Sequence, residues 1–209
     1  MKGRISESRR DGIGLILKSY DFIGINYYTS NYARDDPNFA SQKPSSLTDF
    51  RATLTTGREG VSIGLKANRS SWLATYPKRL RYSWIVSKTN YQNPIISITE
   101  NGKLDYDSFE VQKLIRDEDR VPYHRTHLNA LHEPLKAGVR VKGHFAWSLL
   151  NVQQRPRANT VRFGLVKINF KNQLKRIISD SAKMGPKFPD QLKMMHRNPS
   201  MLLALSNSN

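Results

Sequence analysis

Three short runs of β-branched and aromatic residues recur along the chain, and each is too short for a typical helix. They are residues 20–28 (YDFIGINYY), 94–99 (PIISIT) and 139–147 (VRVKGHFAW). These residue types are typical of strands that are covered on both faces. We therefore expect three strands, each buried on both sides.

Helical patterns separate the three runs. Between the second and third, apolar residues and a histidine recur at three- and four-residue spacing within residues 117–137, and Gly138 then ends the pattern. A shorter helix is predicted over residues 80–88, after Pro77. The order strand, helix, strand, helix, strand favours parallel strands in an α/β fold.

Length and composition fit a single domain, with 209 residues of which 38% are hydrophobic. No apolar run reaches the roughly 18 residues of a spanning helix and no signal peptide opens the sequence, so we expect no membrane partner and leave the compartment open. The chain has no cysteine, which excludes disulfides and cysteine-ligated zinc. We place the domain at residues 1–184 and a loosely ordered basic tail at 185–209, where glycine and prolines interrupt any helix.

The formal net charge of +17 raises nucleic acid as a partner, because clustered lysine and arginine release counterions from phosphates. However, the sequence has no nucleic-acid motif and no basic helix with interleaved aromatic residues. We expect no specific nucleic-acid partner, and binding of anionic polymers through the basic tail stays an alternative.

Chemistry-bearing residues stand where the three predicted strands end. Glu100 closes the second run, Asn26 and Tyr28 close the first, and Trp147 closes the third. A strand-end glutamate can be a purely structural hydrogen-bond acceptor. Here it would share the mouth of a parallel sheet with a tyrosine hydroxyl, an amide and an indole ring, which together suit a sugar: a carboxylate for chemistry, an amide for hydroxyls and an aromatic platform.

The same stretches resemble glycoside hydrolase family 1, in particular its plant β-glucosidases. The resemblance covers most of residues 20–183 in the family's order, and the ITENG and FAWSLL motifs are its most specific parts. The resembling blocks are YDFIGINYYTSNYA (20–33), SSWLATYPKRLR (70–81), YQNPIISITENG (91–102), DRVPYHRTHL (119–128), AGVRVKGHFAWSLL (137–150) and NTVRFGL (159–165).

The resemblance implies a fold, a reaction and roles for residues. The fold would be a partial (β/α)8 TIM barrel that comprises its last three strand-helix units. The family activity is retaining hydrolysis of O-glycosyl bonds, with no cofactor or metal. By resemblance Glu100 is the nucleophile and Tyr28 its hydrogen-bonding partner, while Asn26 and Trp147 line the subsite for the nonreducing sugar.

Two departures from the family pattern concern the active site. A retaining glycosidase needs a second carboxyl group about 5 to 5.5 Å from the nucleophile. The family carries it in a Thr-x-Asn-Glu-Pro block that this sequence lacks; the sole Glu-Pro, at Glu133, lies in a predicted outer helix, far from the mouth. After the last strand, Gln154 and Arg155 stand where the family has a sugar-binding glutamate and a tryptophan, which weakens selectivity for glucose.

Three histidines, His124, His127 and His132, have helical spacings that raise a metal site. No cysteine and no well-placed carboxylate completes such a site, so we interpret them as a solvated helix face and expect no metal.

The sequence thus predicts a truncated β-glucosidase-like protein with little or no activity alone and a β-glucoside as its ligand. Whether it is itself an enzyme stays open. The alternative is a noncatalytic protein that engages a full-length β-glucosidase paralogue through its exposed strand edges.

Overall fold

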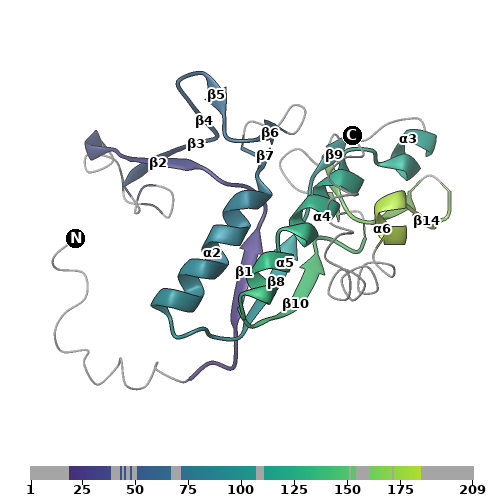
Figure 1. Cartoon of the computed structure of the whole chain (residues 1–209). Helices are drawn as coiled ribbons and strands as arrows, with labels where there is room; N and C mark the ends of the chain where they lie inside the picture. Colours follow the sequence, from purple (N-terminus) through teal and green to yellow (C-terminus); the bar gives the residue numbers. More distant parts are fainter. Residues whose placement is uncertain are drawn as a thin grey trace.

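The computed structural model gives an α/β fold whose elements are labelled in Figure 1. The predicted tail at 185–209 and Gln154 lie outside the residues that it describes. The structure describes residues 19–38, 43, 45, 48, 51–66, 72–106, 111–150, 152–153, 161–170 and 172–184.

A three-stranded parallel sheet forms the centre of the molecule, in the order β1 (Ile23–Tyr27), β8 (Ile96–Asn101) and β10 (Val141–Ala146). Both neighbouring pairs are parallel, as the alternation of strands and helices predicted. Across the described ranges this sheet does not close into a barrel, so β1 and β10 are both edge strands.

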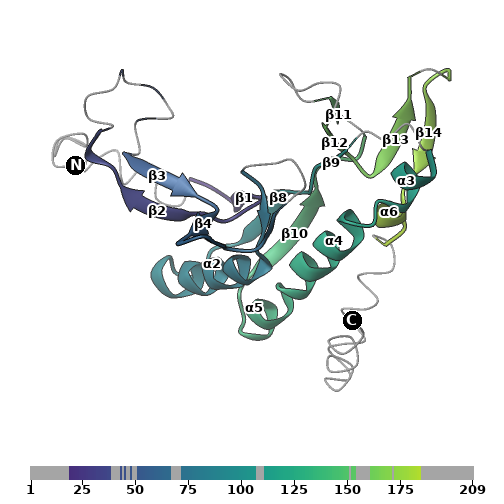
Figure 2. The same ribbon diagram turned by 90° about the horizontal axis from the view of Figure 1, so that it is seen from above.

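Helices cover one face of this sheet (Figures 1 and 2): α2 (Pro77–Asn90), α4 (Arg120–Asn129) and α5 (His132–Lys136). The predicted helix over 80–88 is longer at both ends, and Pro77 occupies its first turn, where a missing N–H costs nothing. The predicted helix over 117–137 is divided into α4 and α5. Pro134 explains part of this division, because a proline is best accommodated in the first turn of the second helix.

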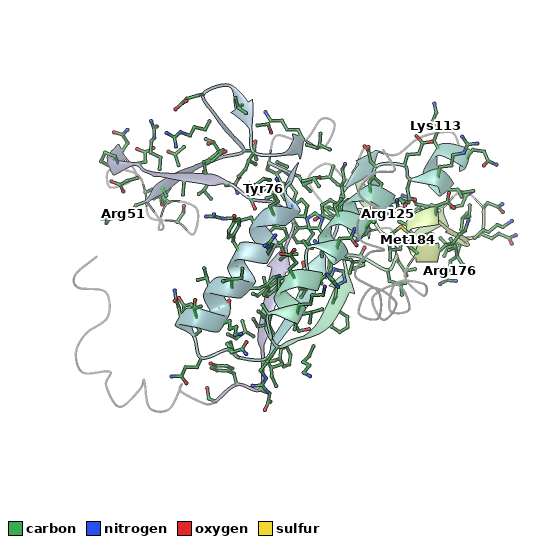
Figure 3. The ribbon with its side chains drawn as sticks, in the orientation of Figure 1. Arg51, Tyr76, Lys113, Arg125, Arg176 and Met184 are labelled. Carbon is green, nitrogen blue, oxygen red and sulfur yellow. The ribbon has the colours of Figure 1, made fainter. Side chains whose placement is uncertain are left out.

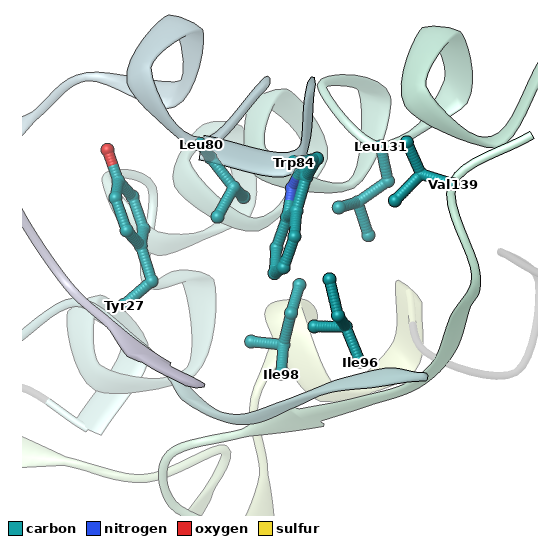
Figure 4. Close-up of a cluster of buried hydrophobic side chains, with 7 residues drawn as sticks. All are labelled: Tyr27, Leu80, Trp84, Ile96, Ile98, Leu131 and Val139. Atoms are coloured by element: carbon teal, nitrogen blue, oxygen red, sulfur yellow. The ribbon is translucent and has the colours of Figure 1, made fainter. Parts of the chain in front are cut away.

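The hydrophobic core lies between the sheet and these helices (Figure 4). Leu80 and Trp84 of α2 are fully buried and pack toward Ile96 and Ile98 of β8. Full burial of one such side chain stabilises a fold by about 1.5 to 3 kcal/mol. The complete buried cluster is Tyr27, Leu80, Trp84, Ile96, Ile98, Leu131 and Val139.

The prediction that the three strands are buried on both faces holds for residues 96–98 of β8, but it is wrong for β1, for β10 and for the C-terminal part of β8. Along β1, Gly24 and Asn26 are exposed while Tyr27 is buried. On β8, Thr99 is exposed, and on β10 the Phe145 side chain is 59% exposed. The physical reason is that helices cover one face, whereas nothing in the described part of the chain covers the other.

A long excursion connects β1 to α2. It is built from short antiparallel pairs, which Figure 1 shows above the N-terminal end of α2. The pairs are β2 (Tyr32–Asp35) with β3 (Ala52–Thr55), β4 (Gly57–Arg58) with β5 (Val61–Ser62), and β6 (Leu65–Lys66) with β7 (Ala74–Thr75).

The remaining elements gather near the C-terminal ends of β8 and β10. Figure 3 shows the Lys113 and Arg176 side chains pointing outward at this end of the molecule. None of the helices in the described ranges is long and apolar enough to cross a membrane. The elements are a small sheet of β9 (Asp105–Tyr106), β12 (Val161–Phe163) and β11 (Val152–Gln153), the hairpin β13 (Val166–Asn169) and β14 (Lys175–Ile178), and the helices α3 (Val111–Arg116) and α6 (Asp180–Met184).

A buried polar network connects this end to α4. The Asp117 carboxylate accepts hydrogen bonds from Arg120 Nη1 at 3.2 Å and from the backbone N–H of Ser181 at 3.0 Å. Arg120 Nη1 also donates to the carbonyl of Gly164 at 2.6 Å, and its Nε donates to the carbonyl of Lys103 at 3.2 Å. Asp117 and Arg120 are 2% and 1% exposed, so this network is part of the core.

Candidate active site

The C-terminal ends of the three parallel strands meet at one end of the sheet. β1 ends just before Tyr28, β8 ends just after Glu100, and β10 ends just before Trp147. Asn26 lies directly beside Glu100 in the register of β1 and β8. The structure therefore places these four residues at the same mouth of the sheet, as the strand order predicted.

A bulge in β8 sets the direction of the Glu100 side chain. Ile98 pairs with β1, Thr99 is skipped, and Glu100 is the next residue in register. Ile98 and Asn101 are buried toward the helices, whereas Thr99 is exposed and donates a 2.7 Å hydrogen bond to Asn26 Oδ1. Glu100 is half-buried, on the side away from Asn101. Bulges often redirect side chains at active sites in this way.

Tyr28 donates its hydroxyl hydrogen bond to Oε2 of Glu100. Burial, together with this hydrogen bond and the negative charge of Glu100, raises the pKa of Tyr28 above its ordinary value. The tyrosine therefore stays protonated at neutral pH and holds the carboxylate from one side. Its ring is fixed by edge contacts with Phe163 and Trp72, at centroid distances of 5.8 and 6.4 Å.

Trp147 is positioned by the backbone of the neighbouring strand. The backbone N–H of Trp147 donates to the backbone carbonyl of Asn101 at 2.8 Å. Its own carbonyl lies so close to Gly102 that a Cβ at that residue would come within 2.0 Å of it, so only glycine fits there. The Trp147 side chain packs with Tyr28 against a second apolar cluster, formed by Leu73, Leu104 and Phe163.

A buried amide lies behind the site, and the sequence reasoning missed it. Nδ2 of Asn101 donates to the carbonyl of Tyr27 at 2.8 Å and to the Tyr123 hydroxyl at 3.0 Å. The Tyr123 hydroxyl donates in turn to the carbonyl of Tyr28 at 3.1 Å. These contacts fix the backbone on both sides of the Tyr28 and Glu100 pair. The available signal was strand alternation, which turns Asn101 away from Glu100 and into the helix layer.

The interpretation of the histidines as a solvated helix face is wrong. His124, His127 and His132 are 5%, 0% and 2% exposed. The His127 ring lies 4.0 Å from the Tyr123 ring, and its Nδ1 hydrogen-bonds the Tyr123 carbonyl at 2.7 Å. No group of three or more metal-ligating side chains is found in the described ranges.

Burial between the sheet and the helices lowers the pKa of three histidines. It lowers the pKa of His124 to about 3, with smaller contributions from the charges of His144, Arg120 and His127, and it lowers the pKa of both His127 and His144 to about 4. The neutral imidazole is therefore the form that the folded state accommodates.

Acidification should consequently destabilise the fold. Below the unfolded value of 6.5, the unfolded chain takes up protons that folded His124, His127 and His144 exclude. Their contribution is fully present above pH 6.5 and is lost as the pH falls toward 4. We expect a loss of up to about 1.4 kcal/mol per pH unit for each histidine between pH 6.5 and 5, where carboxylates contribute little. Urea unfolding at several pH values measures this slope.

The matched variant for this prediction is His124→Gln, which removes one titrating group from the helix layer. It should make the slope of unfolding free energy against pH shallower, whatever it does to stability at pH 7.5. A slope identical to that of the parent chain would contradict the assignment of His124 as a buried neutral histidine.

Glu133 lies on an outer helix, as predicted. It is exposed on α5, and its carboxylate pairs with Arg81 of α2 at 2.5 Å. This glutamate is held by a surface ion pair between two helices rather than at the ends of the strands.

Comparison with known proteins identifies the family to which this chain belongs. The family model described as glycosyl hydrolase family 1 matches residues 2–189. The chain belongs to glycosyl hydrolase family 1. Among curated relatives of this family, Beta-glucosidase 13 of Arabidopsis thaliana is 40% identical over 179 residues, and Beta-glucosidase 11 of Oryza sativa subsp. japonica is 37% identical over 187 residues.

The match covers most of this chain but about a third of each relative. It covers 86% of the chain and 34% of the Arabidopsis protein, and 88% of the chain and 35% of the rice protein. Solved family 1 structures agree. The rice Os3BGlu6 β-glucosidase superposes with a TM-score of 0.75 at 32% identity over 83% of this chain and 37% of that one, and the Trichoderma harzianum enzyme with a TM-score of 0.73 at 30% identity over 91% and 41%.

Proposed function

We propose that this β-glucosidase-like chain carries the nucleophile half of a retaining β-glucosidase site, with Glu100 as the nucleophile. The observation that carries the proposal is the hydrogen bond from Tyr28 to Glu100 at the shared mouth of three parallel strands. A solved rice Os3BGlu6 variant, described as a covalent complex with Glc, superposes on this chain with a TM-score of 0.72, which supports covalent chemistry in the family.

In this proposal one oxygen of Glu100 attacks the anomeric carbon of a β-glucoside while the leaving oxygen departs with the bonding electron pair. Tyr28 holds Oε2, so it orients the carboxylate and stays protonated throughout. Asn26 accepts from Thr99 through Oδ1, which orients its Nδ2 group for a sugar hydroxyl. Trp147 supplies the aromatic platform, and Gln154 is proposed as a weakened acceptor for sugar hydroxyls.

Among the side chains that the structure describes, none at the strand ends is a candidate for the second carboxyl group of the reaction. The sequence contains no Asn-Glu-Pro block, and Glu133 is engaged by Arg81 on the outer surface. Without a general acid the leaving oxygen must depart as an anion. We therefore propose little or no hydrolysis of unactivated glucosides by these 209 residues alone.

The purified chain should discriminate sharply between leaving groups. We expect slow cleavage of a dinitrophenyl β-glucoside, whose leaving group needs no proton, and a rate at least about 10²- to 10⁴-fold lower for a methyl β-glucoside, since that is the usual contribution of general acid catalysis. Initial rates for both substrates, corrected for the uncatalysed reaction, measure the difference. Equal rates would show that an acid is present at the site and would contradict the half-site proposal.

A further inference from the structure

One buried hydrogen-bond network joins the ends of all three parallel strands. Asn101 is the last residue of β8, and its side chain is fully buried. Its Nδ2 donates to the carbonyl of Tyr27 at the end of β1 and to the Tyr123 hydroxyl of α4. Its Oδ1 faces β10, where Nε2 of His144 lies 3.3 Å away. His144 has no role in the chemistry proposed above.

The direction of the hydrogen bond between His144 and Asn101 follows from the other partners of the amide. The Tyr27 carbonyl can only accept, so the Asn101 atom that faces it is the nitrogen. The amide oxygen therefore faces His144, and because this oxygen cannot donate, Nε2 of His144 carries the hydrogen. Burial lowers the pKa of His144 to about 4, so at neutral pH the ring is neutral and Nε2–H is its one N–H group.

The Asn101 amide is fully satisfied only while His144 supplies this donor. Among the described residues, His144 is the one hydrogen-bond partner of Oδ1. A buried oxygen that has lost its donor is unfavourable, and the amide can then gain by rotating away from its present partners. The donor on β10 therefore controls the direction in which the Asn101 amide points.

The same amide fixes the backbone that carries the Tyr28 and Glu100 pair. Asn101 follows Glu100 directly in β8, and its Nδ2 holds the carbonyl of Tyr27. Tyr27 directly precedes Tyr28, so this hydrogen bond ties together the two segments from which the pair projects. The Tyr123 hydroxyl adds a second tie, because it accepts from the Asn101 amide and donates to the carbonyl of Tyr28 at 3.1 Å.

We propose that His144 is a positioning residue of the glycosidase site. Its Nε2–H holds the Asn101 amide, and that amide in turn holds Tyr28 at a fixed distance from Glu100. The inference rests on the function proposed above for Glu100. Reacting groups have to be held within about 0.5 Å of the productive geometry. Removal of this donor should therefore slow the transfer of a glucosyl group to Glu100 and leave recognition of the sugar intact.

The test compares His144→Leu with His144→Gln in the whole chain. Leucine cannot donate, whereas the side-chain nitrogen of glutamine can donate from about the position of the imidazole Nε2. The probe is a dinitrophenyl 2-deoxy-2-fluoro-β-glucoside, whose covalent adduct is followed by intact mass spectrometry. We expect His144→Leu to lower the maximal labelling rate roughly 10- to 100-fold, which is the cost of a displacement of up to about 1 Å.

Two features distinguish positioning from a general loss of structure. The probe concentration that gives half the maximal rate should change less than about twofold in His144→Leu, because the groups that contact the sugar are unchanged. His144→Gln should restore most of the parent rate. His132→Leu is the matched control and should label at the parent rate, because it removes a buried imidazole of α5 that makes none of the hydrogen bonds of this network.

Two NMR measurements test the same contact without any catalysis. In the parent chain, the ¹⁵N shifts of His144 should identify the Nε2–H tautomer. Hydrogen exchange of the Asn101 side-chain amide reports how firmly that amide is held. We expect this exchange to be at least about tenfold faster in His144→Leu than in the parent chain, and close to the parent value in His144→Gln, since a held amide exchanges only when its hydrogen bonds open.

The outcomes separate this inference from the function proposed for Glu100. An Nδ1–H tautomer of His144, unchanged exchange of the Asn101 amide in His144→Leu, or an equal loss of labelling in His144→Leu, His144→Gln and His132→Leu would each overturn the positioning role. Absence of a Glu100 adduct in the parent chain would contradict the proposed function instead, and amide exchange would still decide whether His144 holds Asn101.

Discussion

Glu100→Gln is expected to abolish the transfer of a glucosyl group from an activated β-glucoside to the chain. Glutamine has nearly the same size and its amide oxygen still accepts the hydrogen bond from Tyr28, so the site keeps its shape while the nucleophilic charge is lost. Removal of a nucleophile costs on the order of 10⁴-fold or more. Intact mass spectrometry after incubation with a dinitrophenyl 2-deoxy-2-fluoro-β-glucoside measures the covalent adduct directly.

Two further variants make this result specific. Tyr28→Phe removes a hydrogen bond to a charged group, worth about 1.5 to 3 kcal/mol, and should slow labelling roughly 10- to 100-fold. Glu133→Gln removes the carboxylate of the outer helix and should label at the rate of the parent chain. An adduct that forms equally well in Glu100→Gln, or that maps to another residue, would show that the candidate site is wrong.

The position of this site was predictable from the sequence because it depends on local patterns that strands preserve. Alternation of strands and helices makes the strands parallel, and parallel strands bring residues that follow different runs, such as Tyr28, Glu100 and Trp147, to the same end of the sheet. No contact between distant residues has to be known for this step.

Burial was less predictable, because it depends on what lies against each face. The residues of β1 and β10 are typical of strands that are covered on both faces. In the described part of the chain, other elements cover only one face of these strands, and Phe145 is exposed on the other. A run of β-branched and aromatic residues reports which environment suits a strand and says nothing about whether a neighbour is present. The exposure of these strands therefore depends on how the elements pack together and cannot be read from the sequence of any one segment.

The histidines of the helix layer show the reverse error, because they were predicted to be exposed and are buried. Polar side chains at helical spacing were interpreted as a solvated face, but His127 stacks on Tyr123 and both lie under the strand ends. A neutral imidazole behaves as a ring that can be packed, and one of its nitrogens can hydrogen-bond a backbone carbonyl of its own helix. Only the position of the sheet relative to α4 decides that this face points inward.

Asp117→Ala is expected to destabilise the fold by about 3 to 5 kcal/mol, which is a large share of the 5 to 15 kcal/mol typical of a natural domain. Its carboxylate neutralises the buried Arg120 guanidinium at 3.2 Å and accepts from the N–H of Ser181 at the start of α6. The variant leaves the arginine charge in the core without its carboxylate partner and removes the link between α4 and α6. Urea unfolding followed by circular dichroism measures the loss.

Asp180→Ala is the matched control, because Asp180 is also paired with a cation three residues away, Lys183, at 2.7 Å, but at the surface. An exposed pair of this kind contributes about 0 to 1 kcal/mol, so its removal should change the unfolding midpoint little. Similar losses for the two variants would contradict the argument, because only Asp117 is buried with its cation and also accepts a hydrogen bond from Ser181. A large loss for Asp117→Ala alone would establish that the C-terminal elements are tied to the helix layer through this network.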